Sequence, residues 1–322
     1  MVGGLEMENG VRRWLVNVSQ WNPSEAQFAS VISLFPVDEQ TAITRIEPAI
    51  DKYMNIHFCS RSKRVVLPWE SFQSDMHSLL HAPFHKVGPV HLLTSNLHID
   101  RYIKFEDKKR ALVSRLLQYS LVHEVLGIPF DKIIIHRTAE GKPYLKNSID
   151  FPFSNFNFNV SHHGDYVGIA SEPLCFVGLD IVSITTPKQE TELEFINNFS
   201  PYLTALEWKN IAHAGSSEDM LVEFYRYWCL KEAFVKAIGA GLGYGLHRLE
   251  FHHTNWTGIS VYIDGAESKK WRFSLSKLDE KHWVSIARGL PNKADELCCS
   301  NLLLPELRFS FRTAEELISN VS

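Results

Sequence analysis

A strict alternation of residue types in the segment N155-F-N-F-N-V-S161 constrains the fold more than any other feature of the chain. The two phenylalanines and the valine share one face of the expected strand, and the asparagines and the serine share the other. A turn at residues 162–165 leads to a second strand, Y166-V-G-I-A170, and F176-V-G-L-D-I-V182 is typical of a third. Strands and helices are mixed here without a regular βαβ alternation, so the sequence predicts an α+β fold.

Two long segments around these strands are expected to be helices. Residues 105–126 carry leucines and valines at helical spacing, with two acidic residues near the start and Gly127 as a stop. Residues 219–238 show a similar pattern. Further elements are expected at residues 11–18 (strand), 25–35 (helix), 133–137 (strand), 190–213 (helical), 249–251, 259–263, 271–275 and 283–287 (strands) and 307–318 (strand and helix).

Length and composition are those of an ordinary soluble protein. The 322 residues favour two domains or one double-layered unit. Apolar residues make up 45% of the chain and charged residues 22%. The net charge of −4 provides no global basic field, so the composition does not favour a nucleic-acid partner.

The cysteines and the apolar runs point to the cytosol. The five cysteines are odd in number, irregularly spaced and without a C-x-x-C motif, a pattern typical of a reducing compartment. The first residues lack the features of a signal peptide, and no apolar run approaches the roughly 20 residues that span a bilayer. We therefore expect a cytosolic protein without a membrane partner.

The glycine-rich segment G239-A-G-L-G-Y-G245 could suggest a nucleotide-binding loop. A dinucleotide fingerprint, however, needs a strand before its glycines and a helix after them. Here the expected helix precedes the glycines, and its C-terminal end has the wrong sign for phosphate. A Walker loop is excluded because no G-K-[ST] follows. Gly239 is therefore expected to cap the helix, and a nicotinamide-dependent oxidoreductase is disfavoured.

Carboxylates in two expected elements are candidates for chemistry. Asp180 stands inside an apolar strand, where a carboxylate is costly unless it is paired or bound to a cation. Glu232 and Lys236 lie one turn apart on the expected helix, either as an exposed ion pair or as a ridge that meets an anionic substrate. Mg²⁺ prefers one or two carboxylates together with phosphate oxygens and waters, which the second alternative would supply.

Basic and hydroxyl groups flank two expected turns. Arg137 and Lys142 enclose a tight turn that could present cations and backbone N–H groups to an anion. Ser161 and His162 lie at a strand end. Each residue alone could also be a surface charge or a turn residue. The chain shows no Ser-His-Asp arrangement and no zinc-ligand spacing.

Several of these segments together resemble one family. F158-N-V-S-H-H-G-D-Y-V167, V177-G-L-D-I-V182 and W228-C-L-K-E-A-F-V-K-A-I-G-A-G-L242, in that order, are similar to the signature segments of Sfp-type 4′-phosphopantetheinyl transferases. The turn R137-T-A-E-G-K-P143 and the stretch R101-Y-I-K-F-E-D-K-K-R-A-L112 resemble upstream motifs of that family. The likeness covers about residues 100–290 and is strongest to the animal-type members that serve aminoadipate-semialdehyde dehydrogenase.

The resemblance implies two similar α/β halves with coenzyme A in the cleft between them. We expect the halves at residues 1–170 and 171–322, with an insertion at about residues 45–98. The implied reaction moves the 4′-phosphopantetheine arm of coenzyme A to a serine of an apo carrier, and releases adenosine 3′,5′-bisphosphate. The carriers would be acyl carrier protein or the carrier domains of fatty acid synthase and aminoadipate-semialdehyde dehydrogenase. We expect a monomer.

The resemblance also implies roles for individual residues. Asp180 and Glu232 would hold Mg²⁺, and Glu232 would be the general base, directly or through a water. Lys236 would neutralise the pyrophosphate, and His162 would contact the phosphates. Coenzyme A would be held by these four residues and by Arg137, Thr138, Ala139, Glu140, Gly141, Lys142, Asn159, Val160 and Ser161.

Two positions depart from the family pattern. Val182 stands where many bacterial members carry a further acidic residue, so we expect only two protein ligands for Mg²⁺. The upstream phosphate-binding arginine is assigned to Arg101, with Arg45 and His98 as alternatives. A different class of function, a catalytically silent module that binds coenzyme A or a carrier, would keep the fold without the transfer.

Overall fold

The computed structural model describes residues 10–44, 105–146, 155–185, 190–291 and 308–321. Two compact units divide the chain, one of residues 1–46 with 105–322 and one of residues 47–104. The insertion expected at about residues 45–98 lies outside the described residues. All elements below belong to the first unit.

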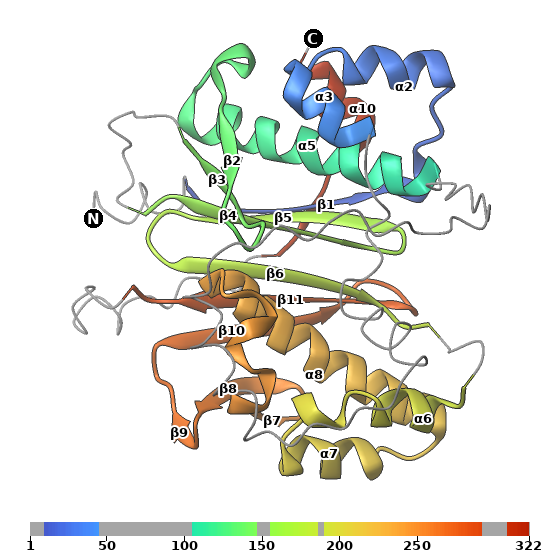
Figure 1. Ribbon diagram of the computed structural model, residues 1–322, viewed down its shortest axis with the longest axis vertical. Coiled ribbons are helices and arrows are strands. Elements are labelled where there is room, and N and C mark those ends of the chain that lie inside the picture. Colours follow the sequence, from blue (N-terminus) through green and yellow to red (C-terminus); the bar gives the residue numbers. More distant parts are fainter. Residues whose placement is uncertain (1–9, 45–104, 147–154, 186–189, 292–307, 322) are drawn as a thin grey trace, which may run out of the picture. The chain divides into compact units, whose positions relative to one another are not determined.

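A four-stranded sheet with the order β12-β1-β5-β4 forms the first layer (Figure 1). Its strands are β1 (Arg12–Asn17), β4 (Asn157–His163), β5 (Tyr166–Glu172) and β12 (Ser310–Phe311). β5 is antiparallel to both β1 and β4, whereas β12 runs parallel to β1.

Helices cover one face of this sheet. The long helix α5 (Phe105–Leu126) packs on β1, β4 and β5, and α3 (Val37–Thr44) and α10 (Ala314–Ser319) pack on α5. In α2 (Glu25–Ile32), Phe28 meets the ring of Phe105 with centroids 5.0 Å apart. Apolar side chains of the sheet and these helices form one buried core. The helix expected at residues 105–126 is therefore confirmed, and its leucines are buried as their spacing predicts.

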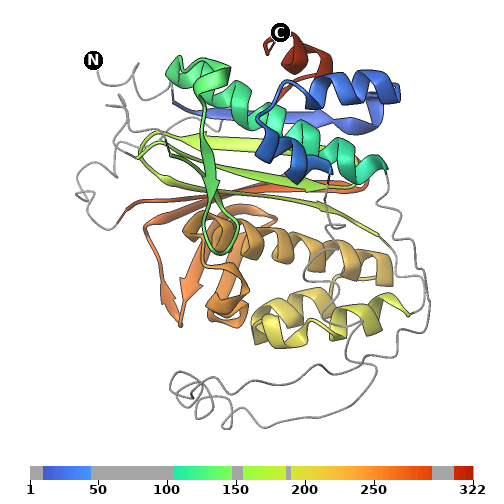
Figure 2. The ribbon, with the colours of Figure 1, turned by 45° about the horizontal axis from the view of Figure 1, so that its top comes forward.

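A three-stranded antiparallel sheet, β10-β11-β6, forms the second layer. Its strands are β6 (Phe176–Ser183), β10 (Trp271–Lys277) and β11 (His282–Gly289). The long helix α8 (Ser217–Ile238) packs on all three strands. A second buried core, with Leu15 and Ala170 from the first sheet and Leu179 and Ile286 from the second, lies between the two sheets. The order of layers is helix, sheet, sheet, helix (Figure 2).

Smaller elements complete the second half. The helices α6 (Glu192–Asn197) and α7 (Ala205–Ala212) pack against α8, and each begins with a capping box. The segment 190–213, expected to be helical, is thus divided into short pieces. The remaining strands are β2 (Ile135–Arg137), β3 (Pro143–Leu145), β7 (Leu249–Thr254), β8 (Thr257–Ile263) and β9 (Ala266–Glu267). β2 and β3 form a two-stranded hairpin, and β7, β8 and β9 form a separate three-stranded sheet.

The mixture of helices and mainly antiparallel sheets confirms the predicted α+β class. In each half a 22-residue helix packs on a sheet. The expected boundary at 170/171 falls within β5. The division of the chain into two halves remains a prediction. The final elements, β12 and α10, join the first sheet and α5.

A ladder of side chains joins the two sheets where β4 lies beside β6. Four side chains on the polar face of β4 each accept a hydrogen bond from a backbone N–H of β6, at distances of 3.0–3.1 Å. A buried N–H needs an acceptor, and here side chains supply what a neighbouring strand would normally supply. We call this set the side-chain ladder: Asn157 to Val177, Asn159 to Leu179, Ser161 to Ile181, and His163 to Ser183.

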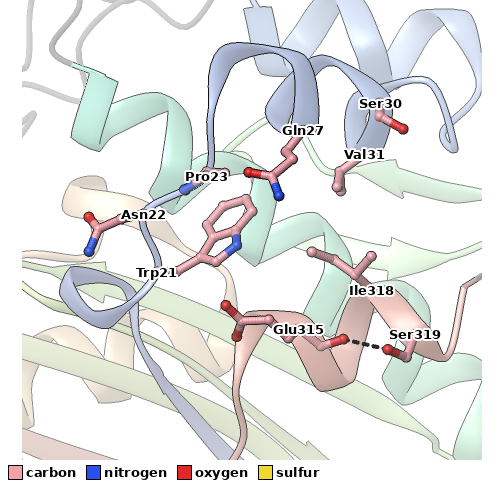
Figure 3. A pocket seen from close by; sticks show the side chains of 9 residues that line it. All are labelled: Trp21, Asn22, Pro23, Gln27, Ser30, Val31, Glu315, Ile318 and Ser319. Carbon is pink, nitrogen blue, oxygen red and sulfur yellow. Dashed lines mark hydrogen bonds between the residues drawn. The ribbon is translucent and has the colours of Figure 1, made fainter.

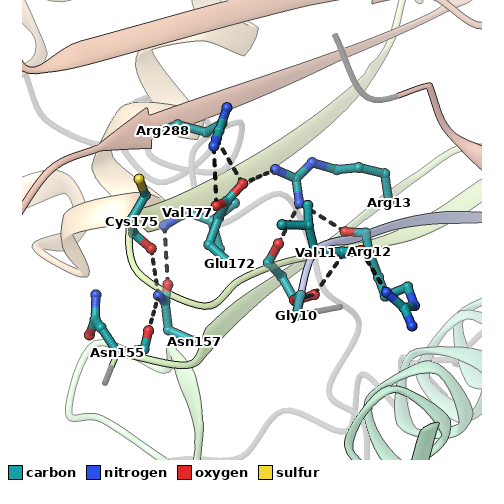
Figure 4. Close-up of polar contacts among 11 residues, drawn as sticks. Gly10, Val11, Arg12, Arg13, Asn155, Asn157, Glu172, Cys175, Val177 and Arg288 are labelled. Carbon is teal, nitrogen blue, oxygen red and sulfur yellow. Dashed lines mark hydrogen bonds and ion pairs between the residues drawn. The ribbon is translucent and has the colours of Figure 1, made fainter. Parts of the chain in front are cut away.

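A buried charged cluster also links the sheets (Figure 4). Glu172, at the end of β5, forms ion pairs with Arg13 of β1 and with Arg288 of β11, the latter at 2.7 Å. Burial lowers the pKa of Arg13, and Glu172 opposes that shift. Removing the carboxylate would leave two guanidinium groups facing each other, so the cluster depends on Glu172.

β6 lies directly against the backbone of α8 at Gly178. A Cβ built at Gly178 would lie 1.9 Å from the carbonyl oxygen of Ala233 and 2.5 Å from the nitrogen of Ala237. Helix backbone cannot move aside as a flexible side chain could. We expect Gly178→Ala to lower the free energy of unfolding by about 2–3 kcal/mol or more, the cost of overpacking a tight contact.

Chemical denaturation of the purified variant measures this loss. Gly243→Ala is the matched control, because a Cβ at Gly243 has no atom within 4 Å and its φ lies outside the left-handed region. Equal stability of Gly178→Ala and the wild type would show that β6 and α8 are packed less tightly than described.

The two long helices, α5 and α8, are too polar to be membrane spans. Among the described residues, no helix combines the length and the apolar character that crossing a membrane requires.

Candidate functional site

Three side chains from three elements meet where the side-chain ladder reaches Asp180. Lys236 Nζ, on α8, lies 2.5 Å from Asp180 Oδ1, on β6. The same ammonium group donates to Ser161 Oγ, on β4, at 3.0 Å. Ser161 Oγ in turn donates to Asp180 Oδ1 at 3.3 Å. The structure therefore brings together three residues that the sequence analysis assigned to one site.

Glu232 and Lys236 are not an exposed surface pair. The second half of α8 is buried nearly all round, and Glu232 is only 2% exposed. The alternative of an exposed ion pair is therefore wrong for Glu232, whereas Lys236 keeps 28% of its side chain exposed. The reason is that α8 packs against the sheet of β6, β10 and β11 on one side and against α6 and α7 on others, which amphipathic spacing alone does not reveal.

Two carboxylates act on the ammonium group of Lys236. Burial would lower the pKa of Lys236, but the carboxylates of Asp180 and Glu232 outweigh it and raise the pKa. Burial raises the pKa of Asp180, and Lys236 opposes that shift. Lys236 thus lies within the field of two buried carboxylates, those of Asp180 and Glu232.

This donor set fits a divalent cation of the magnesium type. Carboxylate oxygens are the ligands that Mg²⁺ prefers, and it usually takes one or two of them with waters and substrate phosphates. Asp180 and Glu232 are the two carboxylates beside Lys236, and Val182 is a buried core residue. In the described part of the chain, no group of three or more His, Cys, Asp or Glu side chains is placed to hold a metal ion.

His162 lies beside the positive charge of this site. Surrounding protein atoms lower the pKa of His162, and the charges of Lys236 and Arg110 act in the same direction. The side chain is exposed to solvent, and the positive charges beside it disfavour a second proton on the ring. At pH 7 the ring is therefore neutral and can donate a hydrogen bond from one nitrogen.

Arg110 has a structural role that the sequence analysis did not assign. Its guanidinium group donates to the carbonyl oxygen of Gly164 at 2.8 Å and pairs with Asp107. Gly164 belongs to the turn that follows His162. Arg110 thereby fixes this turn to the start of α5. The spacing of Asp107 and Arg110, three residues apart on a helix, predicts their pairing, but no sequence pattern predicts the contact with Gly164.

The turn between β2 and β3 reaches the end of α8. Lys142 Nζ donates to the carbonyl oxygen of Ala237 at 2.6 Å, one residue after Lys236. Burial lowers the pKa of Lys142 to about 8. A cation in this position satisfies a terminal helix carbonyl, so Lys142 stabilises the helix end beside the site.

The remaining residues of this turn are exposed. Arg137 donates to the carbonyl oxygen of Gly141 at 3.0 Å, and Thr138 Oγ1 accepts from the N–H of Lys142. Although Arg137 is exposed, surrounding protein atoms and the charge of Arg115 lower its pKa to about 10, and Glu39 opposes that shift. The side chains of Thr138, Ala139 and Glu140 face solvent, and their predicted contact with coenzyme A remains a prediction.

The predicted ligand contacts of β4 are mostly occupied within the protein. Asn159 and Ser161 are buried, and both side chains are rungs of the side-chain ladder. Val160 pairs with Ile169 of β5. His162 therefore remains the exposed side chain among the four predicted positions Asn159–His162. Arg101, Arg45 and His98 lie outside the described residues.

The glycine segment ends the helix, as its sequence predicts. Gly239 adopts φ 69°, ψ 23° as the C-cap of α8, and its N–H donates to the carbonyl oxygen of Val235 at 2.9 Å. Such a left-handed cap favours glycine.

A buried ion pair beside the site was not predicted. Lys231 and Glu207 are both 0% exposed, and their charged atoms are 2.8 Å apart. Lys231 Nζ also donates to the carbonyl oxygens of Leu246 and Leu249 at 3.0 and 2.5 Å. The pair joins α7, α8 and β7 one residue away from Glu232. In the sequence, the one indication of this ion pair is that Lys231 stands within an otherwise apolar stretch of the helix.

A pocket of about 400 Å³ lies away from these residues, between residues 21–31 and α10 (Figure 3). Trp21, Val31 and Ile318 supply apolar surface, and Glu315 is the charged group among the nine residues that line it. None of these nine belongs to the predicted site.

A family model described as 4′-phosphopantetheinyl transferase, N-terminal, matches residues 90–174, and one described as 4′-phosphopantetheinyl transferase superfamily matches residues 176–287. A 4′-phosphopantetheinyl transferase of Paxillus involutus is 33% identical over 187 residues, which are 54% of this chain and 68% of that protein. The chain belongs to the 4′-phosphopantetheinyl transferase superfamily.

Other members of this superfamily are similar over comparable lengths. The L-aminoadipate-semialdehyde dehydrogenase-phosphopantetheinyl transferase of Mus musculus is 41% identical over 202 residues, 60% of this chain and 65% of that protein. A 4′-phosphopantetheinyl transferase of Bacillus pumilus is 29% identical over 207 residues, 63% of this chain and 82% of that protein. The chain thus spans just under two thirds of the mouse protein. These matches confirm the family predicted from the sequence segments.

Proposed function

We propose that this protein transfers 4′-phosphopantetheine from coenzyme A to a serine hydroxyl of an apo carrier protein, with Mg²⁺ as cofactor. Membership of the superfamily supports the reaction class. The observation that carries the proposal is the trio of Asp180, Glu232 and Lys236 on two packed elements, in which both carboxylates are buried.

The reaction exchanges a phosphoanhydride bond at phosphorus for a phosphoester bond to the carrier serine. The carrier serine oxygen forms a bond to the phosphorus next to pantetheine, and the bond from that phosphorus to adenosine 3′,5′-bisphosphate breaks. The serine proton passes to Glu232, directly or through a water, and the leaving group departs as an anion. Because the nucleophile belongs to the partner, this chain needs none of its own.

The protein's own charges supply positioning and charge stabilisation, which dominate phosphoryl-type transfer. Mg²⁺ bound by Asp180 and Glu232 would neutralise the pyrophosphate oxygens. Lys236, held in its charged form, stabilises the negative charge that develops on the leaving phosphate. His162 donates a hydrogen bond to a phosphate oxygen as a neutral ring. The turn Arg137–Lys142 and the backbone of Asn159–His162, with Arg101, would hold the nucleotide part.

The acceptor is a carrier protein or carrier domain. The similarity to the mouse enzyme, whose name includes L-aminoadipate-semialdehyde dehydrogenase, supports a carrier domain of that type. Acyl carrier protein and the carrier domain of fatty acid synthase are further acceptors that we propose. We also propose that the protein acts as a cytosolic monomer.

Incubation of the protein with coenzyme A, Mg²⁺ and an apo carrier tests this function. We expect mass spectrometry to find one phosphopantetheine added to the carrier serine. Chelation with EDTA should abolish the transfer, and excess Mg²⁺ should restore it. Asp180→Asn should lower the rate by about 100-fold or more, because it removes one charge from the proposed metal site.

The assay also separates the two classes of function. Binding of coenzyme A without modification of any of several carriers would identify a silent binding module and refute the transferase. Transfer that persists at full rate in EDTA would refute the proposed metal dependence.

A further inference from the structure

Ser161 lies on the polar face of β4, and its hydrogen bonds determine whether its hydroxyl group can contact a ligand. The family likeness places Ser161 among contacts for coenzyme A. In the structure, however, its side chain is 4% exposed, and its hydroxyl group is fully engaged. It accepts from the N–H of Ile181 at 3.1 Å and from Lys236 Nζ at 3.0 Å, and it donates to Asp180 Oδ1 at 3.3 Å. A hydroxyl group has one proton and two lone pairs, so no capacity remains for a ligand.

The other rungs of the side-chain ladder show the same arrangement. Asn157 accepts from Val177 N at 3.1 Å, and its amide group donates to the carbonyl oxygens of Asn155 and Cys175 (Figure 4). Asn159, 3% exposed, accepts from Leu179 N at 3.0 Å. The rungs recur every second residue along both strands, which keeps β6 in one register against β4.

The register matters because Asp180 lies between two rungs. A shift of β6 by one residue would turn the Asp180 carboxylate to the opposite face of the strand. Ser161 is the rung that also contacts the functional groups themselves. It joins the backbone of β6, the Asp180 carboxylate and the Lys236 ammonium group within one set of hydrogen bonds.

We propose that the side-chain ladder is a positioning device for catalysis, and that Ser161 is a positioning residue that orients Asp180 and Lys236 rather than a contact for coenzyme A. The proposal rests on the proposed transferase function. It moves one residue from the substrate-binding set to the set that holds the metal-binding carboxylate and the charge-stabilising lysine in place.

Ser161→Ala tests the proposal, with Ser171→Ala as a matched control. Ser171, on β5, is also a buried serine whose hydroxyl group accepts one backbone N–H, that of Arg12 at 3.0 Å, and donates to the carbonyl oxygen of Gly10 at 2.9 Å. Both substitutions remove the same group from a strand interior. They should cause similar falls in the melting temperature.

The two variants should differ in catalysis and in binding. We expect Ser161→Ala to lower kcat by about 10–100-fold, the loss typical of a missing hydrogen bond to charged groups, with little change in KM for coenzyme A. Isothermal titration with coenzyme A should give the wild-type Kd without Mg²⁺ and a smaller gain in affinity when Mg²⁺ is added. Ser171→Ala should keep the wild-type kcat and the wild-type gain.

Two outcomes would overturn the proposal. Weaker binding of coenzyme A by Ser161→Ala to the same degree with and without Mg²⁺ would make Ser161 a substrate contact. Equal behaviour of the two variants would make Ser161 merely structural.

A readout independent of turnover separates failure of this proposal from failure of the proposed function. In ¹⁵N NMR spectra, the ammonium group of Lys236 should give a sharp, hydrogen-bonded signal in the wild type and in Ser171→Ala. The signal should shift or broaden in Ser161→Ala. An unchanged Lys236 signal would refute the positioning role even if the protein modified no carrier.

Discussion

Glu232→Gln should lower the rate of phosphopantetheine transfer by about 10²–10⁴-fold, the usual contribution of a general base. Glutamine keeps the shape of the buried side chain but cannot accept a proton, and it removes one of the two carboxylates that face Lys236. The loss should appear in kcat more than in KM for coenzyme A, because the proton is taken in the transition state. Initial rates with one carrier at saturating coenzyme A measure it.

Glu223→Gln is the matched control on the same helix. Glu223 lies nine residues before Glu232, which is half a turn around the helix, and it pairs with Arg226 at 3.0 Å. Its loss should leave the transfer rate near that of the wild type. A wild-type rate for Glu232→Gln would refute both proposed roles of Glu232, whereas an inactive wild-type protein would refute the transferase itself.

Lys231→Met should lower the free energy of unfolding by about 3–5 kcal/mol, the cost of leaving one buried partner charged and alone. Glu207 would remain at 0% exposure, with its hydrogen bonds from the N–H groups of Thr204 and Phe251 but without a counter-ion. The carbonyl oxygens of Leu246 and Leu249 would lose the donor they share. Urea denaturation followed by circular dichroism gives the change.

Two further variants test this account of the ion pair. Lys209→Met changes an exposed lysine on α7, the helix that carries Glu207, and should alter stability by no more than about 0.5 kcal/mol. The double variant Lys231→Met with Glu207→Leu should recover part of the loss, because no uncompensated charge remains. If the double variant were as unstable as the sum of both single changes, the pair would contribute through shape rather than charge.

The strands and long helices could be read from residue patterns because their periods are local. Alternation in residues 155–161 predicted β4, and leucine spacing predicted α5. The use of the polar face of β4 could not be predicted. Asparagine and serine on alternate positions suggest a solvent-facing side, but here they face β6 and satisfy its N–H groups. Such a contact depends on which strand the fold places alongside.

In the candidate site, too, local sequence patterns predicted some features, whereas tertiary packing decided the others. An aspartate in an apolar strand and a Glu–Lys pair on a helix predicted where charge would be needed, and the structure joins Asp180 to Lys236. The burial of Glu232 and the pairing of Lys231 with Glu207 follow from tertiary packing, because residues adjacent on a helix face different partners. Spacing along the chain therefore predicted the candidate site residues but not the residues that support them.

The parallel pairing of β12 with β1 has a consequence for the order of events during synthesis. Trp14 pairs with Ser310 and Leu15 with Phe311, a separation of about 300 residues, and contacts so distant in sequence form slowly. Until residues 310–311 leave the ribosome, β1 has one open edge, which can pair with strands of other chains. The nascent first half is therefore the stage at which this protein most needs protection from aggregation.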